Sequence, residues 1–219
     1  MRRLLLALLL TACGGGRPPP TPPPQLTAPD EGPAPTIAGI ELPPLPEDVT
    51  PQSEDLADGW ELAERALTMP APRPPTGEAW EVEAWAEDEL ADWMRRRGEA
   101  VADVQRAFEA ARHGDAEESV VASMLLGLAY ARFALDVRGL DTPSVFSDDP
   151  ARAEEYRGAL ASAARPLWLR ALDAFGSCAS VAGEQPAHHL GRWRERCDRE
   201  AREASAMLPQ PDDDDDDDG

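Results

Sequence analysis

Apolar residues recur every three or four positions through most of the chain, which is the spacing of one face of an α-helix. No segment shows an alternation strong enough to predict a β-strand. Since only short breaks separate the apolar stretches, we expect an all-α fold of antiparallel helical hairpins. The pattern predicts five helices, over about 53–69, 76–111, 116–138, 150–178 and 187–207.

Proline and glycine mark the breaks between these helices. The run Pro70–Pro75 separates the first helix from the second, which we expect to open at Thr76. Asp149 is a predicted helix cap, and Pro150 suits the first turn that follows it. Pro166 lies inside the fourth predicted helix and is expected to kink or split it.

A run of acidic residues near the start of the second helix precedes three arginines, Arg95–Arg97. Acidic residues early and basic residues late complement the helix dipole, so both runs are interpreted as a solvated helix face rather than as a binding patch. Tryptophans at helical spacing are expected in the core or between hairpins. They could alternatively line a ligand groove, and they are Trp60, Trp80, Trp85, Trp93, Trp168 and Trp193.

Three short motifs in the helical region place small or apolar residues at set distances from an aromatic residue, and the last two have the same spacing. They are Leu126-Gly127-x-x-Tyr130, Ala171-x3-Phe175-x2-Cys178 and Val104-x3-Phe108-x2-Ala111. The motifs resemble the two helices of a tetratricopeptide repeat, and Leu126–Cys178 is similar to helical hairpins in envelope proteins of deltaproteobacteria. The resemblance implies a repeat domain in which small residues let two helices approach and the aromatic side chain fills the groove between hairpins. An irregular helical bundle remains the alternative.

The N-terminus has the organisation of a bacterial export signal. Arg2 and Arg3 precede seven apolar residues, Leu4–Leu10, which are too few to span a bilayer. The segment Leu10-Thr11-Ala12-Cys13 resembles the lipobox of bacterial lipoproteins. This resemblance implies cleavage after residue 12 and lipid attachment to Cys13, which would anchor the protein to the bilayer of the cell envelope. Because Gly14 follows the cysteine, the resemblance favours the outer membrane.

Residues 13–51 combine the predicted lipid site with a segment rich in proline. Proline disfavours both helices and central strands, and polyproline II geometry is its default. We therefore expect a disordered tether that holds the domain away from the membrane. A proline-motif ligand for another protein is the alternative.

Composition then excludes some classes of partner. The 219 residues carry 42 acidic side chains against 21 basic ones, for a formal charge of −21, and every basic residue is arginine. A nucleic-acid partner is not expected, because neutralising phosphates requires a basic surface. Much of the excess charge lies in Asp212–Asp218, seven aspartates whose mutual repulsion predicts a disordered tail. This tail could bind divalent cations weakly or fold back on the arginines of the last helix, which are Arg192, Arg194, Arg196, Arg199 and Arg202.

Two cysteines remain if Cys13 carries lipid. Because the envelope is oxidising, an even number of remaining cysteines predicts a structural disulfide, here between Cys178 and Cys197. A metal site built from these cysteines with His188 and His189 is the alternative, although adjacent helical histidines point about 100° apart. We expect no bound metal and no other cofactor.

The motifs of common catalytic sites are missing from the sequence, and we expect neither catalytic nor cofactor-binding residues, so the protein is predicted not to be an enzyme. We expect an envelope lipoprotein that presents a helical adaptor domain to a protein partner. The alternative is a helical ligand-binding lipoprotein that assists an envelope enzyme or transporter. The predicted organisation is a signal peptide at 1–12, a lipidated cysteine and linker at 13–51, a helical domain at 52–208 and a disordered tail at 209–219.

Overall fold

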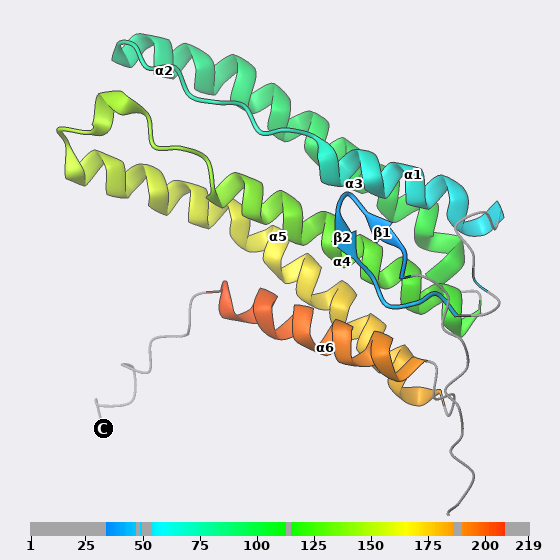
Figure 1. Cartoon of the computed structure of the whole chain (residues 1–219). Coiled ribbons are helices and arrows are strands. Elements are labelled where there is room, and N and C mark those ends of the chain that lie inside the picture. Colours follow the sequence, from blue (N-terminus) through cyan, green and yellow to red (C-terminus); the bar gives the residue numbers. More distant parts are fainter. Residues whose placement is uncertain (1–33, 47–48, 50–53, 113–114, 186–189, 209–219) are drawn as a thin grey trace, which may run out of the picture. The chain divides into compact units, whose positions relative to one another are not determined.

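The computed structural model describes residues 34–46, 49, 54–112, 115–185 and 190–208, all of which belong to the compact unit Gly32–Gly219. The structure confirms the all-α prediction, with only a two-stranded hairpin besides helices among these residues (Figure 1). The α-helices are α1 (Glu54–Thr68), α2 (Ala79–Trp85), α3 (Ala91–Arg112), α4 (Ala116–Arg138), α5 (Pro150–Glu184) and α6 (Gly191–Ala206). A π-helical turn, η1 (Ala86–Leu90), joins α2 to α3, and a 3₁₀ turn, η2 (Ser144–Phe146), precedes α5.

Local capping chemistry sets most of the helix starts. The predicted cap before α5 is confirmed, because the Asp149 carboxylate accepts a hydrogen bond from the Arg152 amide at 3.1 Å and Pro150 follows it. The helix predicted to open at Thr76 instead begins at Ala79. The cause is a reciprocal capping box in which the Glu81 side chain accepts from the Glu78 amide at 2.9 Å.

Two helices contain residues that disfavour a helix interior. Gly98 lies within α3 and is tolerated there. Pro166 was expected to kink or split its helix, but it lies within the 35 residues of α5 and does not split it. A widened turn occurs instead before α3, at η1, where the Ala91 amide bonds to the Ala86 carbonyl, five residues earlier.

Consecutive helices run antiparallel, with α1 beside α3 and α4 beside α5 (Figure 1). We call these pairs the first hairpin and the second hairpin. Helix α4 packs against helices of both hairpins and against α6. It is the one described helix whose length and apolarity would allow it to span a membrane, but 78% of its apolar window is buried inside the domain. Such burial is typical of the core helix of a globular domain.

The two hairpins are closed by the same kind of contact, a glycine against a phenylalanine ring. A Cβ atom on Gly127 of α4 would overlap the Phe175 ring of α5, and one on Gly59 of α1 would overlap the Phe108 ring of α3. Both rings are fully buried. The absence of a side chain at each glycine therefore allows close approach of the paired helices. The Phe175 ring contacts α4 of its own hairpin, whereas the resemblance implied a position in the groove between hairpins.

The predicted tether is wrong for its second half, because residues 34–46 fold onto the helical domain. Strands β1 (Thr36–Ile37) and β2 (Ile40–Glu41) pair antiparallel, and Ile37 lies opposite Ile40. The turn between them has φ of 49° at Ala38 and 80° at Gly39, which are the signs that a two-residue hairpin turn requires.

Apolar side chains explain why this segment is ordered despite its prolines. Ile37, Leu42 and Val49 are at most 2% exposed and belong to the main hydrophobic core. The Trp193 indole of α6 donates a hydrogen bond of 2.9 Å to the Pro44 carbonyl. The folded domain therefore begins about 18 residues earlier than residue 52, where the sequence placed its start.

Candidate functional site

The predicted cysteine pair lies between α5 and α6. Cys178 and Cys197 are fully buried, and their Cα atoms are 5.9 Å apart, within the range of disulfide-bonded cysteines. His188 and His189 of the alternative metal site, and the predicted lipid site Cys13, lie outside the described residues. Within the described ranges, no group of three or more potential metal ligands comes together.

The tryptophans mostly serve the core, as expected. The side chains of Trp85, Trp93, Trp168 and Trp193 are at least 93% buried, whereas Trp80 is 67% exposed. Of the three cavities described below, one has Trp85 in its wall, one has Trp168, and one has no tryptophan.

Arg97 contradicts the interpretation of Arg95–Arg97 as a solvated face. Its side chain is fully buried, whereas Arg95 forms exposed ion pairs with Asp92 and Glu99 on α3. Arg97 donates to the Asp136 carboxylate at 2.9 Å and to the Met69 carbonyl at 3.1 Å. These contacts tie α3 to α4 and to the end of the first helix.

Asp136 is shared between two arginines. Its second oxygen lies 3.1 Å from Nε of Arg132, which is one turn away on α4. Burial raises the pKa of the Asp136 carboxyl, and the positive charges of Arg132 and Arg97 offset part of that rise. Burial also lowers the pKa of the Arg97 guanidinium, while Asp136 opposes that shift. The trio carries one net positive charge.

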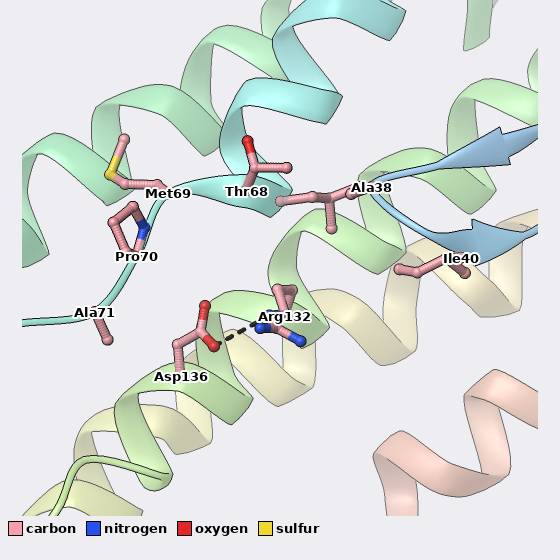
Figure 2. Close-up of a pocket in the computed structure, with 9 residues that line it drawn as sticks. Ala38, Ile40, Thr68, Met69, Pro70, Ala71, Arg132 and Asp136 are labelled. Carbon is pink, nitrogen blue, oxygen red and sulfur yellow. Dashed lines mark ion pairs between the residues drawn. The ribbon is translucent and has the colours of Figure 1, made fainter.

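A cavity of about 360 Å³ opens beside this network (Figure 2). Its wall combines Arg132 and Asp136 with the loop after α1 and the turn of the β-hairpin, where Ala38 and Ile40 lie. We name it the Arg132 cavity. Because Arg132 already pairs with Asp136 in its wall, the charge available to a ligand is small, and the network is better explained as a structural tie between elements.

A second cavity of similar volume lies at the end of the bundle where α2 and the loop before α5 come together (Figure 1). We name it the Trp85 cleft. One side of its wall comes from α2 and η1, which precede α3, and the other side comes from η2 and α5. Its lining residues are Ala79, Val82, Glu83, Trp85, Ala86, Phe146, Arg152, Glu155, Tyr156 and Ala159.

Aromatic rings dominate one side of the Trp85 cleft. The Phe146 and Tyr156 ring centroids are 6.0 Å apart with their planes tilted by 54°, and the Arg152 guanidinium stacks 5.9 Å from the Phe146 ring. The π-turn η1 begins immediately after Trp85 and places Ala86 in the cleft wall. Such turns are frequent at functional sites, because the extra residue redirects neighbouring side chains.

Two hydrogen-bond donors of the Trp85 cleft have no partner among the described residues. They are the indole N–H of Trp85, whose side chain is 93% buried, and the buried hydroxyl of Tyr156. Buried polar groups normally find partners, so two unsatisfied donors among the residues that line one cleft are unusual. Burial, together with the negative charge of Asp141, also raises the pKa of the Tyr156 phenol, so it remains a donor well into the alkaline range.

The pattern of the sequence offered partial signals for these features. Arg97 follows Met94 by three residues and precedes Val101 by four, so it falls on the apolar face of its helix, which was a signal for burial. Ala38-Gly39 between Ile37 and Ile40 was a weak hairpin signal. Nothing in the spacing indicated the Trp85 cleft, because its two walls come from segments that are more than 55 residues apart.

Comparison of the chain with protein-family models, with curated proteins and with solved structures finds no match. The function is therefore inferred from the chain's own residues.

Proposed function

We propose that this chain is a lipoprotein of the bacterial cell envelope, held in the outer membrane by lipid on Cys13, whose helical domain is an adaptor for a protein partner. The residues Leu10-Thr11-Ala12-Cys13 support the anchor. The Gly–Phe contacts that close both hairpins support a tetratricopeptide-like arrangement. The disulfide between Cys178 and Cys197 belongs to the same proposal, because the envelope is oxidising.

The Trp85 cleft carries the adaptor proposal. A peptide segment of the partner would place carbonyl oxygens against the Trp85 indole and the Tyr156 hydroxyl, the two donors that lack partners. An apolar side chain of the same segment would pack among the rings of Phe146 and Tyr156. The role is binding rather than catalysis.

Site-specific photocrosslinking tests this assignment in intact envelopes. A benzophenone amino acid replaces Ala159, which lines the cleft, and in a control it replaces Leu169, which is 48% exposed on the same helix. We expect one discrete partner adduct from position 159 and none from position 169. Tyr156→Phe should weaken the adduct while the fold is kept. Identical adducts from both positions, or an adduct indifferent to Tyr156→Phe, would overturn the assignment.

The anchor has a separate test. Metabolic labelling with palmitate should mark the wild-type protein and not a Cys13→Ser variant, which should also leave the membrane fraction. Equal labelling of the two proteins would contradict lipid attachment at this residue.

A small-molecule ligand is the second candidate, because the volume of the cleft, about 360 Å³, falls in the range of ligand pockets. Mass spectrometry of the protein purified from its native envelope distinguishes the two. A stoichiometric small molecule that is lost in Tyr156→Phe would favour ligand binding over the adaptor.

A further inference from the structure

A third cavity, also of about 360 Å³, lies where the ends of α4 and α6 meet the middle of α5. We name it the Arg138 cavity. Four of its lining residues carry polar side chains, and the others are alanines and the apolar residues at the end of α6. The polar ones are Arg138, Ser162, Arg165 and Trp168.

Every polar side chain of the Arg138 cavity can donate a hydrogen bond, and no acidic residue lines it. Trp168 is 96% buried, and its indole N–H has no hydrogen-bond partner in the described part of the chain. Arg138 donates a hydrogen bond of 3.4 Å to the sulfur of Met207, and neither Arg138 nor Arg165 forms an ion pair within the described ranges. The wall thus combines two uncompensated positive charges with a buried free donor, which suits a carboxylate ligand.

The chain itself supplies carboxylates at this place. Leu208, the last described residue, lines the cavity, and Asp212 follows it four residues later. Even a fully extended chain spans only about 14 Å over four residues, so Asp212 is tethered within about 14 Å of Leu208. Tethering at such short range gives the tail an effective concentration on the order of millimolar, which few free anions would match.

Two of the α6 arginines that the sequence suggested as a place for the tail to fold back are less suitable. Arg196 pairs with Glu200 at 2.7 Å, and Arg194 lies 3.9 Å from Asp198, both within α6. The charge of these two arginines is therefore partly compensated by the helix that carries them, whereas Arg138 and Arg165 form no ion pair among the described residues.

We propose that the Arg138 cavity is the docking site of the chain's own acidic tail, Asp212–Asp218. Tail carboxylates pair with the guanidinium groups of Arg138 and Arg165, and one accepts the indole N–H of Trp168. The docked tail covers the Arg138 cavity. The Trp85 cleft is lined by different residues and stays open to its partner. The site is independent of the proposed adaptor function.

The absence of lysine from the chain permits a specific test. Arg165→Lys places a single side-chain amine in the cavity wall and keeps its charge. Carbodiimide then joins that amine to any carboxylate in direct contact, and peptide mapping of the monomeric product locates the link. The matched control is Arg65→Lys, an exposed position on α1 that does not line the cavity.

We expect the Arg165→Lys protein to be linked mainly to the tail, at least tenfold more than the Arg65→Lys protein at equal protein concentration. Equal linkage from the two positions would mean that the tail meets basic groups at random and would overturn the proposal. So would linkage of Arg165→Lys only to residues outside 212–218.

A second measurement uses the wild-type chain and a chain shortened by removing residues 212–219. The Trp168 indole N–H resonance, assigned with Trp168→Phe, should shift on truncation and exchange faster with solvent. Addition of 0.5 M salt should move the full-length resonance toward the truncated position, because screening weakens the ion pairs. An indole resonance identical in the two chains would contradict docking.

Discussion

Gly127 of α4 faces the ring of Phe175 on α5 so closely that no side chain fits between them. The second hairpin is the most extensively packed pair of helices in the described domain, and this contact lies within it. The pairing of a glycine with a buried phenylalanine recurs in the first hairpin between Gly59 and Phe108. The two hairpins therefore obtain close packing by the same means.

Replacing Gly127 with alanine should destabilise the domain, because the new methyl group overlaps the Phe175 ring. Overpacking of this kind costs about 1–3 kcal/mol of unfolding free energy. Gly176→Ala is the matched control, since the position lies in the same helix as Phe175 and a Cβ there meets no atom within 4 Å. That variant should gain up to about 1 kcal/mol from the higher helix propensity of alanine. Urea unfolding curves measure the change in unfolding free energy for each variant. A loss of stability in both variants would contradict the packing explanation.

The buried ion pair predicts a strong asymmetry between single and double variants. Asp136→Asn leaves the Arg97 guanidinium buried without its counter-charge, which should cost about 3–5 kcal/mol of stability. The double variant Arg97→Met with Asp136→Leu removes both charges and should recover most of that loss. Urea unfolding of the single and double variants is the measurement. If the double variant is as unstable as Asp136→Asn, desolvation of Arg97 is not the cause.

Much of the fold was predictable because the apolar periodicity of the helices is strong. The bounds of α4 agree with the predicted 116–138, and the Asp149-Pro150 start of α5 is as the cap chemistry required. The ordered segment 34–46 was not, since its stability depends on distant partners such as Trp193, whose indole donates to the Pro44 carbonyl. Arg97 was interpreted by its charge, although its position on the apolar face governs its burial. The clefts depend on tertiary contacts between hairpins, which local pattern does not encode.

Tyr156 should ionise at unusually high pH. Burial raises the pKa of the Tyr156 phenol above its ordinary value of 10.0. The contribution of this group to stability is therefore fully present below the unfolded-state pKa and is lost as pH rises through the folded-state pKa. Because the chain has two tyrosines, subtracting the phenolate absorbance titration of Tyr156→Phe from that of the wild type isolates this residue. We expect a midpoint above 10. Near pH 7, Tyr156→Phe should match or exceed wild-type stability, since it removes a buried hydroxyl without a partner. A midpoint at or below 10 would show that the phenol is solvated.

The cysteine pair should stabilise the oxidised domain. Closing the loop between residues 178 and 197, which are 19 positions apart, contributes about 3 kcal/mol in the chain-entropy description. Protein isolated from the envelope and denatured without reductant should show no alkylation of Cys178 or Cys197. The Cys178→Ala and Cys197→Ala double variant should unfold at lower urea concentration by a corresponding amount, and reductant should no longer affect it. Full alkylation of both residues without reductant would exclude the bond.

The packing of residues 34–46 onto the helices has a consequence for how the proposed anchor controls encounters. Only the 20 residues from 14 to 33 lie between Cys13 and residue 34, where the described part of the domain begins, instead of the 38 from 14 to 51. At about 3.1 Å per residue, the greatest distance between Cys13 and residue 34 is roughly 60 Å. The volume that the domain can explore shrinks with the cube of the reach, by about sevenfold, so the local concentration at which it meets a neighbouring envelope protein rises by a similar factor.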